Sequence, residues 1–90
     1  MRCFYPYDSL YLKSMDTVDL RFSRVLKKLR KSKGLTQEAL AQRAGVDYKY
    51  LQKLEGRDPS SPTLVTLEKI AHGLELSLVD LINLLASEEI

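Results

Sequence analysis

One short stretch, LTQEALAQRAGVDYKYLQKLE at residues 35–55, most limits how this chain can fold. Thr36 and Asp47 are good helix-capping residues, and each precedes a run whose apolar residues recur at helical spacing. The segment Ala44-Gly45-Val46 is all that joins the two runs. A turn this tight requires a residue that tolerates positive φ, and Gly45 does so without a Cβ penalty. The stretch therefore predicts two short helices joined by a sharp turn.

The residue types on the inner side of these two helices agree with close packing. Ala41 is small at the point where the helices would cross, so their backbones can approach. The remaining inward positions are apolar: Leu40, Ala44, Val46, Leu51 and Leu54. Together these features indicate a helix-turn-helix. Glycine-linked helical hairpins also occur in bundles that bind no nucleic acid, so the hairpin alone leaves function open.

Three further helices are expected from their caps and their apolar periodicity. The first helix is capped by Asp16 or Thr17 and ends at Gly34. The second has Ser61 as its cap and Pro62 in its first turn, and it ends at Gly73. The last begins at Ser77, which together with Asp80 resembles a capping box. Their inward residues are predicted to be Phe22, Val25, Leu26 and Leu29 in the first, and Leu64, Leu67, Ile70 and Ala71 in the second. We therefore predict an all-α fold of five helices.

Charge is distributed unevenly along the 90 residues, although the net charge is only +2. Residues 21–57 carry eleven Lys and Arg against three acids, whereas residues 58–90 carry one Lys against six acids. One basic and one acidic region in a small domain are typical of a surface that meets a polyanion. A solvated, salt-bridged surface would give the same counts, so the positions of the charges have to decide.

The outer face of the second helix in the hairpin favours nucleic acid. If Leu51 and Leu54 point inward, the outward side carries only donors and dual donor–acceptors, at Tyr48, Lys49, Gln52 and Lys53. No acid lies between Asp47 and Glu55. Such side chains read base edges and contact phosphates in a major groove. We therefore predict that these four residues read bases.

At this point the chain closely resembles the Cro/repressor family, the Xre or lambda-repressor-like helix-turn-helix proteins. The segments that carry the resemblance are LKKLRKSKGLTQEALAQRAGV, YLQKLEG and PTLVTLEKIAHGLELSLVDLI, within residues 20–84. The family implies a compact five-helix domain that binds double-stranded DNA through its third helix, here residues 47–55. It also implies a transcriptional regulator, expected to be a repressor, that acts as a homodimer on a near-palindromic operator.

The resemblance also implies roles for single residues. Gln37 matches a family residue that contacts a DNA phosphate and supports the recognition helix, and Arg30 with Glu55 matches a partly buried ion pair. Departures from the family pattern are Asp47 in place of Ser or Thr, the bulky Tyr48, and a turn after the third helix that is one residue shorter than usual. Arg57 is therefore expected at the phosphate backbone, and weaker candidates for the same role are Thr36, Tyr50 and Ser60.

The last predicted helix has more apolar residues than one core contact uses. The predicted dimer interface consists of Val79, Ile82, Leu84, Leu85 and Ile90. A frayed hydrophobic C-terminus is the alternative.

We divide the chain into residues 1–15, an N-terminal arm or an extension of the gene model, and residues 16–90, the DNA-binding domain. The first fourteen residues hold four of the seven aromatic residues.

Several functions are disfavoured by what the sequence lacks. One His, one Cys and no glycine-rich phosphate loop provide neither a nucleophile–base pair nor a metal cluster, so no enzyme, cofactor or metal is expected. No ligand-binding domain, membrane span or signal peptide is recognisable, and the expected location is the cytoplasm. The alternative function is a helix-turn-helix protein-interaction module, such as an antitoxin-like partner or an accessory subunit.

Overall fold

Every helix in the described part of the chain, residues 17–87, begins at an oxygen-bearing side chain. In the computed structural model, Thr17, Thr36, Asp47 and Thr63 each accept a hydrogen bond from a backbone N–H in the first turn of a helix. Ser77 does the same for the N–H of Asp80, at 3.0 Å. These bonds satisfy N–H groups that have no partner within the helix.

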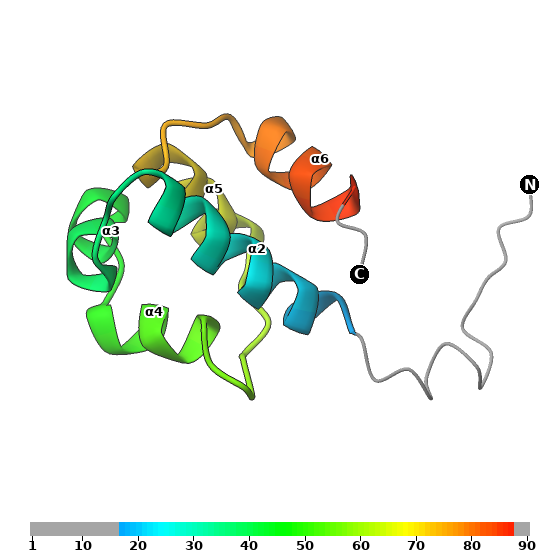
Figure 1. Cartoon of the computed structure of the whole chain (residues 1–90), viewed down its shortest axis with the longest axis horizontal. Helices are drawn as coiled ribbons and strands as arrows, with labels where there is room; N and C mark the ends of the chain where they lie inside the picture. Colours follow the sequence, from blue (N-terminus) through cyan, green and yellow to red (C-terminus); the bar gives the residue numbers. More distant parts are fainter. Residues whose placement is uncertain (1–16, 88–90) are drawn as a thin grey trace, which may run out of the picture.

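The described residues form five α-helices and contain no strand (Figure 1). Their bounds are α2 (Val18–Ser32), α3 (Gln37–Ala44), α4 (Tyr48–Leu54), α5 (Leu64–Gly73) and α6 (Leu78–Ser87). The predicted all-α, five-helix fold is thus confirmed. No single helix in residues 17–87 is long and apolar enough to cross a membrane; α5 and α6 meet that test only when taken together, and they are bent by 97° at their break.

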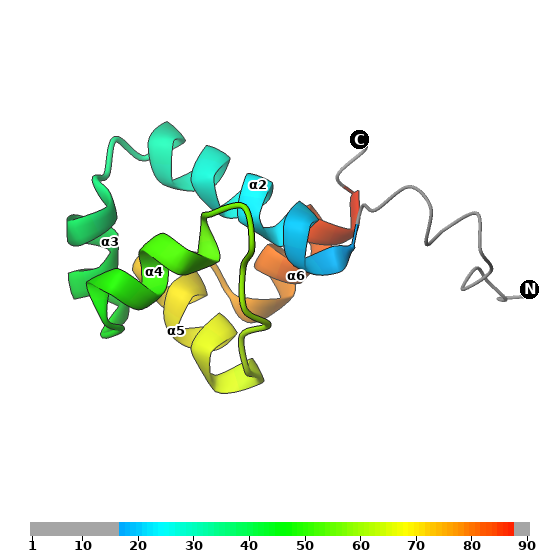
Figure 2. The same ribbon diagram turned by 90° about the horizontal axis from the view of Figure 1, so that it is seen from below.

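The helices enclose one core, to which all five contribute. In Figure 1 and Figure 2, α3 and α4 lie at one end of the molecule, α6 lies toward the other, and α2 spans the distance between them. Helix α3 packs against both α4 and α5, and α6 packs against α5 and α2. The fully buried large side chains are Leu26, Leu40, Leu51, Leu54, Ile70, Leu74 and Leu81. Through this core the α3–α4 hairpin packs against the rest of the domain.

The start of α5 differs from the prediction. Ser61 does not cap the helix; its hydroxyl donates to the carboxylate of Asp19 in α2, and Thr63 is the N-cap. Leu64 was expected in the core but is 72% exposed. Because the helix begins two residues later than predicted, Leu64 lies in its first turn and outside the packed region.

The end of α5 also differs from the prediction, and for a packing reason. Gly73 is the last helical residue rather than the stop, and it is buried. A Cβ at this position would lie 3.0 Å from Leu40 Cδ1 and 3.1 Å from both Ala44 Cβ and Ala44 N. Gly73 therefore allows α5 to approach α3 closely. The left-handed residue that follows α5 is Glu75, with φ of 63°.

Three helices end with one hydrogen-bond pattern, in which an N–H two or three residues beyond a helix reaches back to a carbonyl within it. These bonds join Leu35 to Arg30, Val46 to Ala41, and Leu76 to Ala71, at 2.8–3.1 Å. Each requires a left-handed residue just before the donor, and Gly34 and Gly45 supply it for α2 and α3. The predicted positive φ at Gly45, 72°, sets the sharp turn between α3 and α4.

Candidate nucleic-acid interface

Helix α4 presents a polar face without acids to the solvent. Leu51 and Leu54 are fully buried and anchor the helix to the core. The four predicted base-reading residues, Tyr48, Lys49, Gln52 and Lys53, are all exposed on the other side. The structure therefore places these four together on one accessible surface.

Two of these side chains are held by local hydrogen bonds. Gln52 Nε2 donates to the Tyr48 hydroxyl at 3.1 Å, across one turn of α4. Lys53 Nζ donates to the backbone carbonyl of Asp58 at 3.3 Å, and thus links α4 to the loop that follows it. Both contacts are solvent-exposed, so the lysine charge remains accessible to an anion.

Asp47 uses its charge at the N-terminus of α4. Its Oδ2 accepts hydrogen bonds from the N–H groups of Lys49 and Tyr50, at 3.1 and 3.2 Å. A carboxylate at this position is stabilised by the positive end of the helix dipole. The cap therefore partly offsets the negative charge that distinguishes Asp47 from the Ser or Thr typical of the resembled family.

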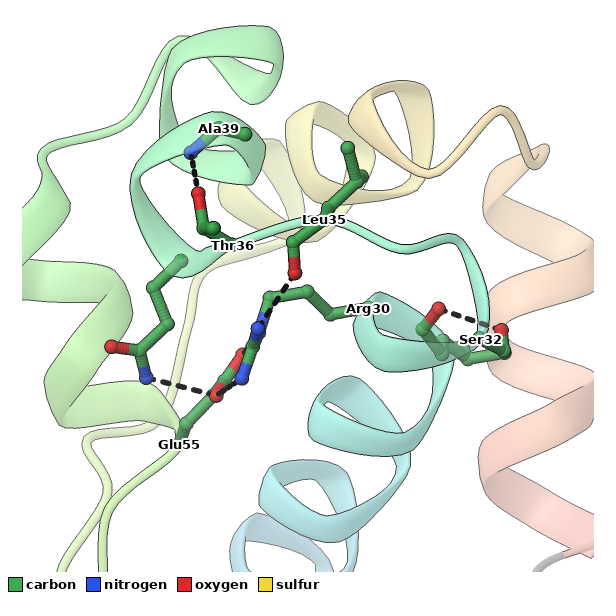
Figure 3. A network of polar contacts seen from close by, with 8 residues as sticks. Arg30, Ser32, Leu35, Thr36, Ala39 and Glu55 are labelled. Atoms are coloured by element: carbon green, nitrogen blue, oxygen red, sulfur yellow. Dashed lines mark hydrogen bonds and ion pairs between the residues drawn. The ribbon is translucent and has the colours of Figure 1, made fainter.

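A buried polar network fixes α4 relative to α2 and α3. Arg30 donates from Nε and Nη2 to the two carboxylate oxygens of Glu55, at 2.7 and 3.0 Å (Figure 3). Arg30 Nη1 also donates to the carbonyl of Leu35 at 2.8 Å, and Gln37 Nε2 donates to Glu55 Oε1 at 2.9 Å. The structure thus joins the two members of the predicted ion pair and adds Gln37, from the start of α3, to the same carboxylate.

Sequence reasoning missed Ser23, which contacts the end of the same hairpin. This serine is buried, at 6% exposure, and its hydroxyl donates to the carbonyl of Gly56 at 3.2 Å. Gly56 precedes Arg57, so the bond holds the segment that carries this arginine against α2. Ser23, Leu26 and Arg30 share one face of α2 at spacings of three and four residues, and that spacing was the available signal.

The residues predicted to contact the DNA backbone differ in how exposed they are. Thr36 and Arg57 are exposed, and Thr36 Oγ1 accepts the N–H of Ala39 as the α3 cap. Tyr50 and Ser60 are half-buried, and Tyr50 packs against the core. Gln37, at the N-terminus of α3, is half-buried, and its amide nitrogen donates to Glu55. Thr36 and Arg57 are thus the more accessible candidates.

The predicted dimer surface on α6 is partly exposed. Val79, Ile82 and Leu84 are 67%, 37% and 40% exposed, whereas Leu85 packs partly against the core. Ile90 and the N-terminal arm, residues 1–15, lie outside the described residues. Beside Leu85 is an apolar hollow of about 160 Å³, lined by Val18, Asp19, Phe22, Pro62, Leu67 and Leu85.

No cluster of three or more His, Cys, Asp or Glu that could hold a metal ion occurs within residues 17–87. The buried polar side chains that converge in these residues are those of the Arg30–Glu55 network, which bond to one another at hydrogen-bond distances. The arrangement is thus an exposed polar helix on a fixed support, a geometry suited to recognition of a surface.

Two helices joined by a glycine turn, the second with an exposed donor-rich face, define a helix-turn-helix protein. The family model described as Helix-turn-helix matches residues 26–81. The chain belongs to this family, and the resemblance to Cro/repressor proteins seen in the sequence is confirmed.

Two transcriptional regulators are similar to this chain in sequence. The uncharacterized HTH-type transcriptional regulator y4dJ of Sinorhizobium fredii is 44% identical over 56 residues, which are 62% of this chain and 71% of that protein. The HTH-type transcriptional regulator SinR of Bacillus licheniformis is 36% identical over 58 residues, or 64% of this chain. The match spans only 52% of SinR.

Solved structures match over more of the chain. The restriction-modification controller protein C.Esp1396I bound to a 19 base pair DNA duplex has a TM-score of 0.70 and 38% identity, covering 77% of this chain and 91% of that one. The same protein bound to a 25 base pair operator site has a TM-score of 0.72 and 37% identity, covering 78% and 91%. The controller protein C.AhdI from Aeromonas hydrophila has a TM-score of 0.65 and 35% identity, covering 70% and 94%.

Proposed function

We propose that this protein is a transcriptional regulator that binds double-stranded DNA sequence-specifically, as a repressor, with α4 in the major groove. The observation that carries the proposal is the exposed face of α4, which has donors and no acid between Asp47 and Glu55. Membership in the helix-turn-helix family and the likeness to DNA-bound C.Esp1396I support it. In this arrangement the N-terminus of α3 lies at the phosphate backbone while α4 reads bases.

The residues around α4 divide into two roles. Lys49 and Gln52 supply most of the discrimination between sequences, because they are exposed on the face that meets base edges. Arg57 and Thr36 contact phosphates and supply attraction that does not depend on sequence. Arg30 and Glu55 contact neither bases nor phosphates, and instead keep α4 at a fixed angle to the rest of the domain.

A homodimer completes the proposed binding unit. Val79, Ile82 and Leu84 present apolar side chains from α6 to solvent, and burying them against a second copy removes that area from water. Two-fold symmetry then predicts operator half-sites about 34–36 Å apart. Sedimentation of the full chain should show a dimer, and Leu84→Glu should shift it toward monomer; a monomer at high micromolar concentration without DNA would contradict a preformed dimer.

A binding selection on random duplexes, followed by sequencing, tests the proposal directly. We expect a near-palindromic site with two half-sites about one helical turn apart. Log affinity for that site should fall linearly with log salt concentration, because Lys and Arg release counterions from DNA phosphates. Failure of the selection to enrich any sequence at low salt would refute sequence-specific binding.

The same measurement distinguishes a DNA-binding regulator from the alternative, a protein-interaction module with this fold. Such a module would use the α6 surface but would not need the basic residues around α2–α4. It would bind duplex DNA weakly or not at all, and its association with a protein partner would lack the steep salt dependence.

A narrower candidate is control of a restriction-modification system. It is favoured because the match covers 91–94% of C.Esp1396I and C.AhdI, both described as restriction-modification controller proteins. The operator recovered by the selection should then occur upstream of restriction and modification genes in the same genome. Operator copies found only upstream of unrelated genes would rule out this narrower role.

A further inference from the structure

The hydrogen bond between Tyr48 and Gln52 lies in the middle of the exposed face of α4. The two residues are one helical turn apart, and Gln52 Nε2 lies 3.1 Å from the Tyr48 hydroxyl oxygen. Tyr48 is 37% exposed, and its hydroxyl reaches the glutamine amide. The bulky side chain at position 48 therefore acts on a neighbouring reader, and not only on DNA.

The bond changes what Gln52 can offer to a base. A glutamine side chain has one carbonyl oxygen and two amide N–H groups. With one N–H donated to Tyr48, the oxygen and the second N–H remain. That remaining pair is what adenine requires in the major groove, where N6 donates and N7 accepts.

The amide has one orientation in this contact. An unrestrained glutamine can rotate its terminal amide and present either end to the groove. In the structure Nε2 lies on the Tyr48 side and donates to the hydroxyl. A reversed amide would present Oε1 to the same hydroxyl, which can also donate, so the expected adenine preference depends on the orientation seen here. A fixed arrangement of donor and acceptor discriminates between bases better than one that can reverse.

We propose that Tyr48 is a positioning residue for Gln52, and that the pair selects an adenine at one position of each operator half-site. This inference rests on the proposed function and deepens it. The Tyr48 hydroxyl accepts from Gln52 and keeps its own hydrogen, which is free to donate to a phosphate. Tyr48 and Gln52 thus act as one unit, whereas Lys49 reads independently.

The test uses the full chain and the operator obtained by selection. Binding of the wild type, Tyr48→Phe, Gln52→Ala and the double variant is measured on duplexes that carry each base at every half-site position. A bidentate contact discriminates roughly 5- to 150-fold, and we expect an adenine preference in that range for the wild type. Gln52→Ala should abolish it, and Tyr48→Phe should reduce it at least about threefold at the same position.

The double variant and a control substitution outside α4 make the inference specific. Tyr48→Phe added to Gln52→Ala should cause no further loss of base preference, because the two residues act through one contact. Ser32→Ala removes an exposed hydroxyl from α2, outside the proposed DNA-binding residues, and it should leave the adenine preference intact. Thermal unfolding should be similar for all variants, since each substitution removes only a hydroxyl or an exposed side chain.

Three results would overturn the inference. They are an unchanged preference in Tyr48→Phe, additive effects in the double variant, and a base other than adenine at the position that responds to Gln52→Ala. Failure of the wild type to bind any selected duplex is a different result, because it would refute the proposed function itself.

Discussion

Replacing Arg30 with methionine should lower the free energy of unfolding by roughly 3–5 kcal/mol. The guanidinium makes two bonds to Glu55 and one to the carbonyl of Leu35, all between 2.7 and 3.0 Å. Arg30→Met would leave the Glu55 carboxylate inside the protein with Gln37 as its remaining partner in this network. The cost arises from this unbalanced buried charge more than from the loss of an attraction.

Solvent screening does little to reduce this cost. The side chains of Arg30 and Glu55 are only 11% and 1% exposed. A domain of this size has a total stability of about 5–15 kcal/mol, so one substitution would remove a large share of it. Replacing both residues by methionine removes both charges, and should be much less destabilising than the sum of the single substitutions.

Urea unfolding at constant pH of the single and double variants provides the measurement. Lys31→Met is the matched control, because Lys31 is an exposed basic residue next to Arg30 in α2 and its loss should change stability by less than about 0.5 kcal/mol. The reasoning would be refuted if Arg30→Met cost less than about 1 kcal/mol. Additivity of Arg30→Met and Glu55→Met in the double variant would refute it as well.

Three further predictions concern packing, backbone and recognition. Gly73→Ala should destabilise the protein by about 1 kcal/mol in thermal unfolding despite the better helix propensity of alanine, because the new Cβ meets the backbone and Cβ of Ala44 at 3.1 Å; a rise in Tm would contradict this. Glu75→Gly should stabilise the protein by about 1 kcal/mol, since it relieves a left-handed φ of 63° and breaks only ion pairs of 3.7 and 3.9 Å that are exposed; Glu75→Ala should show no such gain. In titrations against the operator and single-base variants, Lys49→Ala should lose discrimination at one position, of about 1–3 kcal/mol. Arg57→Ala should weaken binding to all sequences alike, and should reduce the slope of log affinity against log salt concentration by about one. An equal loss on all sequences for both variants would contradict this division of roles.

The hairpin was the best-predicted part of the fold because its signals are local. The caps at Thr36 and Asp47 bond to N–H groups two or three residues away. The left-handed turn at Gly45 is also decided within a few residues. For the same reason, the outward position of Lys49 and Lys53 follows from the inward position of Leu51 and Leu54, since a helix fixes their relative directions.

The ends of α5 could not be predicted in the same way. Ser61 and Thr63 are both plausible caps, and the contact of Ser61 with Asp19, far away in the sequence, leaves Thr63 as the cap. Gly73 looked like a helix stop because glycine commonly is one. Its actual role depends on the distance between α5 and α3, which is a property of the packed core.

By itself, the sequence determined which segments are helical, where most of them begin, and that α4 turns an acid-free side away from its leucines. Those features depend on hydrogen bonds and periodicities that extend over a few residues. Only the tertiary structure decided that Ser23 holds Gly56 and that Gln37 joins Arg30 on one carboxylate. Such pairings depend on how helices approach and which rotamers their side chains adopt, and these are fixed only when the core is packed.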